Sequence, residues 1–264
     1  MLLAIDLGNS HTVLGVYDRK ELVKSWRIST SSEKTADEVA ALIVALHENA
    51  GLSPRSIEAV IISSVVPPAT PVLEEVSQRY FSQTPLVVGP GVKTGMPILC
   101  DQPKEIGTDR IVNGVAAYEK YHDATIVVDF GTATTFDYIT KKGEYMGGVI
   151  APGLHISMEA LFLKASKLPR VELAKPKGII GKNTIHAIQS GLVYGYVGLV
   201  DGIVTRIQRE GKSRARVVAT GGIASLIAPE CSTIEETDEF LTLDGLRIIH
   251  DRNRQARRSS RPGI

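Results

Sequence analysis

The sequence is poor in features that would define several protein classes. Its only two cysteines, Cys100 and Cys231, form neither a CxxC nor a Cys/His pattern, so neither a disulfide framework nor a thiolate metal site is indicated. The formal net charge is only +1, so no overall field favours nucleic acid or an anionic membrane. The longest apolar run, which contains residues 40–46 and begins at Val39, is far below the roughly 18 residues of a membrane-spanning helix. The apolar N-terminus meets Asp6 too early for a signal peptide, and we therefore expect a cytoplasmic protein with neither nucleic acid nor membrane as partner.

Two common nucleotide-binding signatures are also absent. The sequence contains neither the Walker A pattern GxxxxGK[ST] nor a GxGxxG motif that opens a helix. The P-loop and Rossmann designs therefore lack their own signatures, and any nucleotide site must be of another kind.

The composition and hydrophobic patterning are those of an α/β protein. Hydrophobic residues make up 43% and charged residues 22% of the 264 residues, enough for one large or two modest globular domains. Strand-like runs alternate with segments of helical periodicity, which is typical of α/β folds. The predicted strands cover residues 2–6, 13–27 with a turn at 18–20, 59–66, 86–88, 125–129, 135–140, 144–150 and 216–219. The predicted helices cover residues 32–50, 71–81, 109–121, 153–164, 184–208 and 244–250.

A pattern of strand, glycine turn and strand occurs twice. Residues 5–13, IDLGNSHTV, can be set over residues 128–136, VDFGTATTF. The identical pairs are Asp6 with Asp129, Gly8 with Gly131, and Thr12 with Thr135. Each copy opens one half of the chain, so an internal duplication is the economical interpretation. We predict domains at 1–110 and 111–250, followed by a basic tail at 251–264 that we expect to be disordered.

The two Asp-x-Gly turns have residues that suit a phosphate and a cation. Glycine lets the backbone approach a ligand closely, and the N–H and hydroxyl groups that follow can donate to phosphate oxygens. The carboxylates of Asp6 and Asp129 would repel phosphate, so their use would be to hold a cation or its waters. One such turn is more commonly an ordinary hairpin, but the second copy favours binding. A third turn, Thr220–Gly221–Gly222, could lie against an adenine or a ribose.

These three motifs resemble the two phosphate motifs and the adenosine motif of the acetate/sugar kinase, heat-shock chaperone and actin superfamily. Three further stretches resemble motifs of type III pantothenate kinases: residues 107–110 (GTDR), 147–150 (GGVI) and 181–184 (GKNT). The resemblance to this family covers the chain almost from end to end. The resemblance implies two actin-like (ribonuclease H-like) α/β domains with a nucleotide cleft between them. It also implies ATP-dependent phosphorylation of pantothenate to 4'-phosphopantothenate, the first step towards coenzyme A. The enzyme would be a homodimer that needs Mg²⁺ and a monovalent cation, K⁺ or NH₄⁺.

The resemblance also implies individual site residues. It assigns Asp109 as the catalytic base and Asp129 as the ligand of the monovalent cation. The implied ATP-binding residues are Asp6, Leu7, Gly8, Asn9, Ser10, His11, Thr12, Val13 and Thr132. The implied pantothenate-binding residues are Cys100, Gly107, Thr108, Asp109, Arg110 and Thr184. Cys100 departs from the family, which often has Tyr there, and a thiol reproduces neither the reach nor the hydrogen bond of a phenol. His11 is likewise not a residue that the family requires.

Without the resemblance, the residues leave several roles open. Thr108 is a candidate helix cap, and Asp109 in a first helical turn would be stabilised as the anion by the helix dipole, so capping alone would explain it. Arg110 suits a bidentate pair with a substrate carboxylate, or an ion pair at the surface. Two other functions stay open: a nucleotide-binding regulator that has lost phosphoryl transfer, and a kinase for another small hydroxy acid, which Cys100 makes conceivable.

Overall fold

The computed structural model describes residues 1–259, whose contacts divide the chain into two compact units. Unit 1 comprises Met1–Met96, Gln102–Ala116 and the chain from Thr242 onward, and unit 2 comprises Pro97–Asp101 and Ala117–Leu241. These limits differ from the predicted boundary at residues 110 and 111. A boundary drawn once along the chain could not include the return of the C-terminal helix to unit 1.

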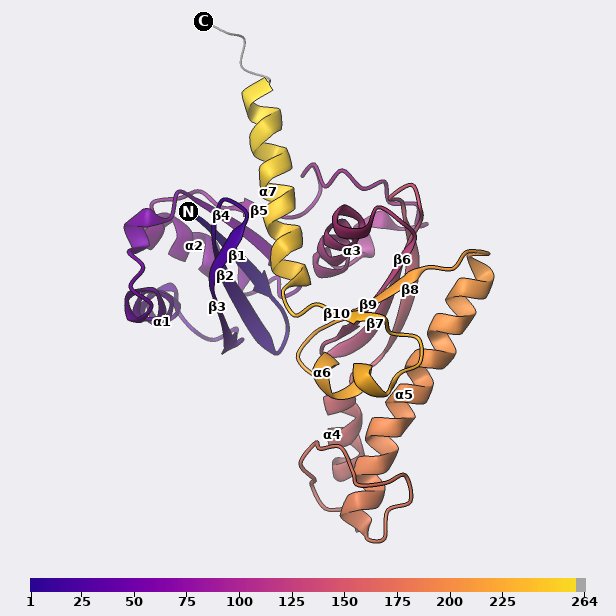
Figure 1. The fold of residues 1–264 in the computed structure, drawn as a ribbon. Coiled ribbons are helices and arrows are strands. Elements are labelled where there is room, and N and C mark those ends of the chain that lie inside the picture. Colours follow the sequence, from indigo (N-terminus) through magenta and orange to yellow (C-terminus); the bar gives the residue numbers. More distant parts are fainter. Residues whose placement is uncertain (260–264) are drawn as a thin grey trace, which may run out of the picture. The chain divides into compact units, whose positions relative to one another are not determined.

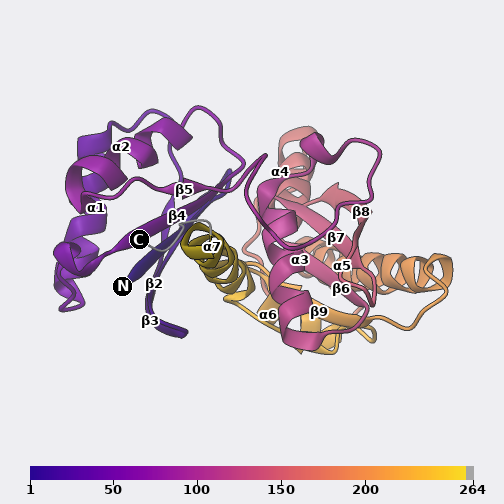
Figure 2. The same cartoon turned by 90° about the horizontal axis from the view of Figure 1, so that it is seen from above.

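Unit 1 is a five-stranded mixed sheet with helices on both faces (Figures 1 and 2). Its strands are β1 (Leu2–Leu7), β2 (His11–Asp18), β3 (Glu21–Ser29), β4 (Ala59–Ser64) and β5 (Leu86–Val87), in the order β3-β2-β1-β4-β5. Its helices are α1 (Ala36–Asn49), α2 (Thr70–Phe81), the first part of α3 (Thr108–Tyr121) and nearly all of α7 (Leu241–Ser259), with short 3₁₀ turns at Pro54–Ser56 and Pro103–Glu105.

The alternation of side chains along β2 explains how helices cover both faces of this sheet. Leu14 and Val16 belong to the core that includes residues of α1 and α2. Gly15 and Tyr17 point the other way, towards α7. A Cβ at Gly15 would lie 2.7 Å from a methyl carbon of Leu243, and Tyr17 Oη donates to Asp244 Oδ1 at 3.1 Å.

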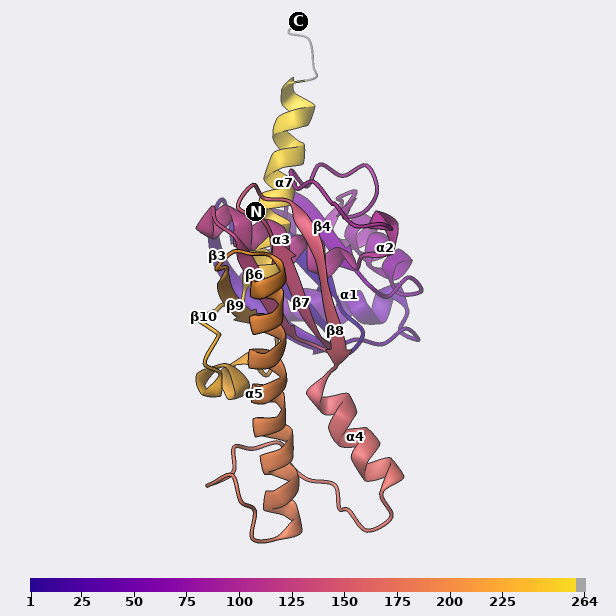
Figure 3. The same ribbon diagram turned by 90° about the vertical axis from the view of Figure 1, so that its right-hand side faces the viewer.

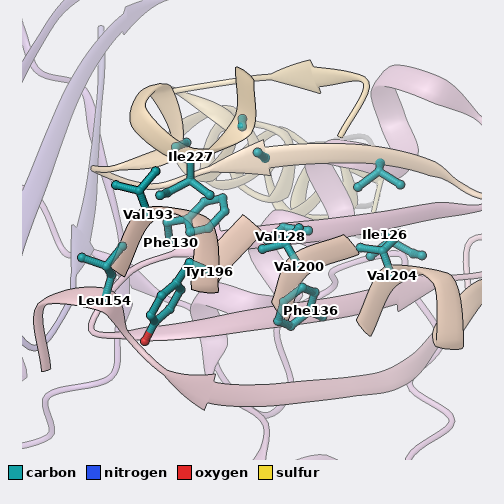
Figure 4. Close-up of a cluster of buried hydrophobic side chains, with 14 of the residues drawn as sticks. Ile126, Val128, Phe130, Phe136, Leu154, Val193, Tyr196, Val200, Val204 and Ile227 are labelled. Atoms are coloured by element: carbon teal, nitrogen blue, oxygen red, sulfur yellow. The ribbon is translucent and has the colours of Figure 1, made fainter. Parts of the chain in front are cut away.

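Unit 2 contains a second five-stranded mixed sheet with the long helix α5 against one face (Figures 1 and 3). Its strands are β6 (Thr125–Phe130), β7 (Ala133–Ile139), β8 (Tyr145–Pro152), β9 (Arg216–Thr220) and β10 (Glu236–Thr237), in the order β10-β9-β6-β7-β8. Its helices are the end of α3, α4 (Leu154–Lys164), α5 (Thr184–Glu210) and α6 (Ala224–Ile227), with a 3₁₀ turn at Ala228–Glu230. Alternate residues of β6, such as Val128, pack against Val193, Tyr196 and Val200 of α5 (Figure 4).

The two sheets have the same topology, and the predicted α/β fold class is confirmed. Reading the second order backwards gives β8-β7-β6-β9-β10, which matches β3-β2-β1-β4-β5 strand for strand and direction for direction. The register irregularity between Val16 and Tyr17 in the first sheet also has its counterpart between Tyr138 and Ile139 in the second. A shared irregularity is not required by either sheet, so it supports the duplication.

The strand register corrects one detail of the repeat. Leu7 pairs with Thr12, whereas Phe130 pairs with Thr134. The first turn is therefore one residue longer than the second, and Thr12 corresponds to Thr134 rather than to Thr135. The ungapped comparison of the two sequences could not place this insertion.

The C-terminal helix corrects the expectation for the basic tail. α7 reaches Ser259, so residues 251–259 are helical and only residues 260–264 lie outside the described chain. This part of the helix lacks an apolar periodicity, and polar contacts hold it instead. The side-chain amide of Asn253 accepts from the backbone N–H of Lys93 at 3.1 Å and donates to its carbonyl at 3.0 Å, and Arg252 donates to the carbonyl of Thr94.

Helix α5 is apolar over a long stretch even though glycines and polar residues interrupt its apolar runs. Among the described residues it is the one helix whose length and composition would suffice to cross a membrane. Seven of its residues are buried, and six of these, among them Leu192, Val200 and Val204, pack in the core of unit 2. The helix is therefore anchored in unit 2 along the face that bears these residues.

Candidate active site

The first Asp-x-Gly turn is built at the end of β1 in unit 1. Asp6 is half-buried and is the last residue but one of β1. The N–H of Gly8 donates to the carbonyl of His11 at 3.1 Å, which closes the turn. Asn9, Ser10 and His11 are exposed, as ligand-binding residues of a loop must be. The Leu7 side chain is buried in the core, so only its backbone groups can serve a ligand.

Thr30, which the sequence analysis did not identify, holds this turn in place. Its Oγ1 donates to the carbonyl of Gly8 at 2.7 Å and lies 2.9 Å from Thr12 Oγ1, and its N–H donates to the carbonyl of Ser10 at 3.1 Å. Thr30 follows β3 and is remote in sequence from the turn. The only available signal was the hydroxyl-rich stretch of residues 29–32.

The second Asp-x-Gly turn is supported by the start of α4 in unit 2. The N–H of Gly131 donates to the carbonyl of Ala133 at 3.0 Å, and the N–H of Gly153 donates to the carbonyl of Thr132 at 3.1 Å. A Cβ at position 153 would lie 2.1 Å from that carbonyl oxygen. Glycine is therefore required there. In the strand that follows the turn, the buried Oγ1 of Thr134 has no hydrogen-bond partner.

The glycine turn after β9 lies directly against Asp129. Thr220 pairs with Asp129 in the sheet, and Gly221 adopts φ +94°. A Cβ at Gly221 would lie 2.6 Å from Asp129 Oδ1 and 2.6 Å from the carbonyl oxygen of Phe130. The third motif and the second phosphate motif are thus parts of one structure within unit 2.

The oxygens around Asp129 suit a hard cation better than a transition metal. The half-buried Asp129 contributes a carboxylate, and the carbonyl oxygen of Phe130 converges on the same glycine backbone. Oxygen-only donor sets favour hard cations such as K⁺ and Mg²⁺. Among the described residues, no three His, Cys, Asp or Glu side chains cluster as a dedicated metal site, so a cation here would also need oxygens from a ligand or water.

The start of α3 lies beside the first phosphate turn in unit 1. Thr108 Oγ1 donates to the carbonyl of Ser64 at 3.0 Å, accepts from its N–H at 3.2 Å and lies 3.0 Å from Ser63 Oγ. Ser63 pairs with Asp6 across β1 and β4. The Thr108 hydroxyl therefore fixes α3 to β4, which brings Asp109 to the same sheet edge as Asp6.

The pKa of Asp109 moves in the direction opposite to that expected for a helix cap. Burial raises the pKa of this carboxyl above its ordinary value, although the N–H and the charge of Arg110 oppose the shift. The N–H of Arg110 donates to Asp109 Oδ1 at 2.8 Å. Desolvation outweighs these opposing effects, so the carboxylate is a stronger base than an exposed Asp.

Gly107 leaves the space that the Asp109 carboxylate occupies. A Cβ at position 107 would lie 2.4 Å from Asp109 Oδ1. We expect Gly107→Ala to displace this carboxylate and lower kcat by about 10²-fold, the typical effect of a misplacement of about 1 Å. Because a side-chain terminus can move cheaply, the melting temperature should change little. Steady-state kinetics and thermal denaturation measure both effects.

The matched control for this prediction is Gly89→Ala, because nothing lies within 4 Å of a Cβ at that position. It should keep wild-type kcat. Adding Gly107→Ala to Asp109→Asn should cost little further activity, since both act on one carboxylate. Fully additive losses would mean that Gly107 acts elsewhere.

The residues that the resemblance assigns to pantothenate are distributed over both units. Gly107 to Arg110 belong to unit 1, whereas Cys100 and Thr184 belong to unit 2. Cys100 lies on the segment Pro97–Asp101, which is held on Tyr145: the N–H of Leu99 donates to the carbonyl of Tyr145 at 2.8 Å.

Thr184 is the exposed first residue of α5, which Asn183 caps by accepting the N–H of His186 at 2.8 Å. It borders an open groove of about 700 Å³ in unit 2. The other residues that line this groove are Leu161, Leu168, Gly181, Lys182, Asn183, Ala187, Ile188, Gly191 and Leu192.

Comparisons with known proteins identify the family of this chain. The family model for type III pantothenate kinase matches residues 2–206. A type III pantothenate kinase of Geotalea uraniireducens is 64% identical over 97% of this chain and 100% of its own length, and one of Geobacter sulfurreducens is 62% identical over 97% and 100%.

Solved structures agree with the fold. A Baf family protein of Campylobacter jejuni has a TM-score of 0.60 at 18% identity, covering 96% of this chain and 99% of its own. A candidate N-acetylglucosamine kinase of Porphyromonas gingivalis has a TM-score of 0.52 at 15% identity, covering 96% and 100%. The predictions of an actin-like fold and of a kinase are confirmed, and the chain belongs to the type III pantothenate kinase family.

Proposed function

We propose that this protein transfers the γ-phosphoryl group of ATP to the terminal hydroxyl of pantothenate, giving 4'-phosphopantothenate in the first step of coenzyme A biosynthesis. Membership of the type III pantothenate kinase family supports this activity. The observation that carries the mechanism is the half-buried carboxylate of Asp109, which has a raised pKa and lies at the sheet edge that also bears Asp6.

Asp109 is the proposed general base. Its carboxylate orients the pantothenate hydroxyl and accepts its proton as the bond to phosphorus forms. Phosphoryl transfer depends mainly on positioning and on neutralisation of charge, so a base of modest strength is sufficient. The raised pKa of Asp109 brings it closer to the operating pH, where general bases are most effective.

The two phosphate turns are the proposed ATP-binding elements. In unit 1, the backbone and side chains of residues 6–13 contact the phosphates, and Thr30 keeps this turn in shape. In unit 2, Thr132 is a further ATP contact and Asp129 a ligand of K⁺ or NH₄⁺, next to Gly221. Mg²⁺ and the monovalent cation would supply neutralisation of the phosphate charge.

Pantothenate recognition is assigned to residues of both units. The guanidinium of Arg110 can pair bidentately with the pantothenate carboxylate, and Gly107 and Thr108 shape the start of α3 beside it. Thr184 and Cys100 are the proposed contacts from unit 2. Because Cys100 lacks the phenol that the resemblance leads us to expect at this position, acceptance of another small hydroxy acid is the alternative that the assay must include.

We also propose a homodimer, assembled through an apolar surface of unit 2. Helix α4 and the first half of α5 extend past the end of their sheet (Figures 1 and 3). Their exposed apolar side chains, with those of the preceding loop, are Ile156, Leu161, Phe162, Leu163, Ile179, Ile180 and Ile185. Exposed apolar side chains gathered on neighbouring elements favour an interface, and a second copy can bury the same surface on both partners.

Sedimentation analysis tests the dimer. The wild-type protein should sediment as a dimer, and Ile180→Asp, which places a charge on a side chain that is 84% exposed, should sediment as a folded monomer. A monomeric wild type would contradict the proposal. Burial of this surface in a dimer would also fit the proposed cytoplasmic location, with neither nucleic acid nor membrane as partner.

The activity itself is tested with ATP and a panel of acceptors in K⁺, NH₄⁺ and Na⁺ buffers. We expect ADP formation that depends on pantothenate, exceeds that with related hydroxy acids, and is greater in K⁺ or NH₄⁺ than in Na⁺. Faster turnover of another hydroxy acid would reassign the substrate. ATP binding without turnover of any acceptor would indicate a nucleotide-binding regulator.

A further inference from the structure

A buried tyrosine and a buried aspartate face each other in the sheet of unit 2. Tyr145 Oη donates to Asp137 Oδ1 at 2.6 Å, and the relative exposure of both residues is 0%. Thr135 Oγ1 donates to the other oxygen, Asp137 Oδ2, at 3.3 Å. A carboxyl group inside a sheet costs desolvation free energy that hydrogen bonds must offset. An arrangement of this kind is expected where it serves a purpose beyond packing.

The repeat shows that the fold does not require this pair. The strand registers match Asp137 with Gly15 and Tyr145 with Leu22. In unit 1 the same position is filled by apolar contact, because Leu22 Cδ1 lies 3.2 Å from where a Cβ on Gly15 would be. One sheet therefore closes this position with glycine and leucine, and the other with a hydrogen-bonded polar pair.

The pair has a structural consequence that its counterpart lacks, because Tyr145 anchors the segment Pro97–Asp101. The N–H of Tyr145 donates to the carbonyl of Pro97 at 2.8 Å, and its carbonyl accepts from the N–H of Leu99 at 2.8 Å. Ile98 forms a parallel bridge with the same residue. Three consecutive residues before Cys100 thus depend on the position of one tyrosine backbone.

The segment continues to Cys100, which faces a glycine of β8. Cys100 Sγ lies 3.6 Å from the place that a Cβ on Gly147 would occupy, and Gly147 adopts φ +121°. The thiol therefore lies over bare backbone two residues beyond Tyr145. A shift of the anchor would move Cys100 directly.

We propose that Tyr145 and Asp137 are positioning residues for pantothenate, acting through the segment that carries Cys100. The hydrogen bond at the far end of the ring fixes the Tyr145 side chain, and the side chain fixes the backbone to which residues 97–99 are bonded. This inference rests on the proposed function, because it takes Cys100 to contact the acceptor. It assigns acceptor selection to a pair that touches no substrate.

Tyr145→Phe tests the proposal, because it removes only the hydroxyl and keeps the ring. We expect KM for pantothenate to rise about 10-fold, as for the loss of one hydrogen bond to a charged group, whereas kcat and KM for ATP stay within about 2-fold. Asp137→Asn keeps an acceptor for the Tyr145 hydroxyl and should largely preserve KM for pantothenate. Asp137→Leu should behave like Tyr145→Phe.

Tyr17→Phe is the matched control. Tyr17 is also 0% exposed and also donates to a carboxylate, Asp244, but in unit 1. Tyr17→Phe should lower the melting temperature about as much as Tyr145→Phe does, but it should leave KM for pantothenate unchanged. An equal rise of KM in both variants, or none in Tyr145→Phe, would overturn the proposal.

Thiol labelling separates this proposal from the proposed function, because it needs no turnover. Burial raises the pKa of Cys231 to about 12, so Cys100 should be the thiol that reacts at neutral pH. Tyr145→Phe should speed labelling of Cys100 and Tyr17→Phe should not. If wild type has no pantothenate kinase activity, the function fails whatever the labelling shows. If labelling in Tyr145→Phe equals wild type, the positioning role fails whatever the activity.

Discussion

Asp109→Asn is expected to lower kcat by about 10²- to 10⁴-fold, the usual contribution of a general base. The amide occupies the same volume but cannot accept the proton of the acceptor hydroxyl. The N–H of Arg110, which donates to Asp109 Oδ1 at 2.8 Å, can still donate to the amide oxygen. The fold and the affinity for ATP should therefore persist, and steady-state kinetics with ATP-binding calorimetry would separate the two effects.

The pH dependence gives this prediction a second readout. The base must be ionised to act, so kcat/KM of the wild type should fall as the pH drops through the pKa of Asp109. Because burial raises this pKa, the acid limb should lie above the ordinary range of an aspartate, and Asp109→Asn should lack it. Glu105→Gln, which alters an exposed carboxylate four residues earlier, is the control and should keep both rate and profile. Wild-type turnover by Asp109→Asn would remove the assignment of Asp109 as base.

Gly221→Ala should have the next largest effect, on nucleotide and cation binding. Its φ of +94° is unfavourable for any residue with a Cβ, and that Cβ would lie 2.6 Å from both Asp129 Oδ1 and the carbonyl oxygen of Phe130. The backbone oxygen cannot swing away as a side chain can, so β6 and the turn after β9 must separate. We expect KM for ATP to rise at least 10-fold and the activation by K⁺ to weaken, with stability lower by about 1–3 kcal/mol.

Denaturation and binding measurements distinguish this effect from simple unfolding. Gly178→Ala, where nothing lies within 4 Å of a Cβ, is the control from the same unit and should match wild type. ATP affinity should be measured at a temperature where Gly221→Ala is folded. Unchanged affinity and K⁺ response in the folded variant would show that the glycine turn serves the fold and not the ligand.

Much of the fold could be predicted because its signals are local. Helical periodicity placed α1, α2 and α5 to within a few residues, and the repeated Asp-x-Gly turns indicated the duplication that the two sheets display. The signals for the C-terminal helix were not local. Residues of α7 are held by contacts to Lys93 and Thr94, about 160 residues away in sequence.

The parts of the candidate site that were missed also depend on distant neighbours. Thr30 contacts the first turn from another strand, and the register that matches Thr12 with Thr134 follows from strand pairing. The pKa of Asp109 was predicted in the wrong direction because the sequence shows the helix start but not the burial. The Asp137–Tyr145 pair gave no sequence signal, since each residue is unremarkable alone.

The central claim is most directly tested by following the γ-phosphoryl group itself. ATP labelled in the γ position is incubated with pantothenate and either wild-type protein or Asp109→Asn, and the products are separated and located by phosphorus NMR. The account predicts label on the terminal hydroxyl of pantothenate with the wild type and almost none with the variant. Label transferred equally by both proteins, or wild-type protein that binds ATP yet leaves pantothenate unlabelled, would contradict it.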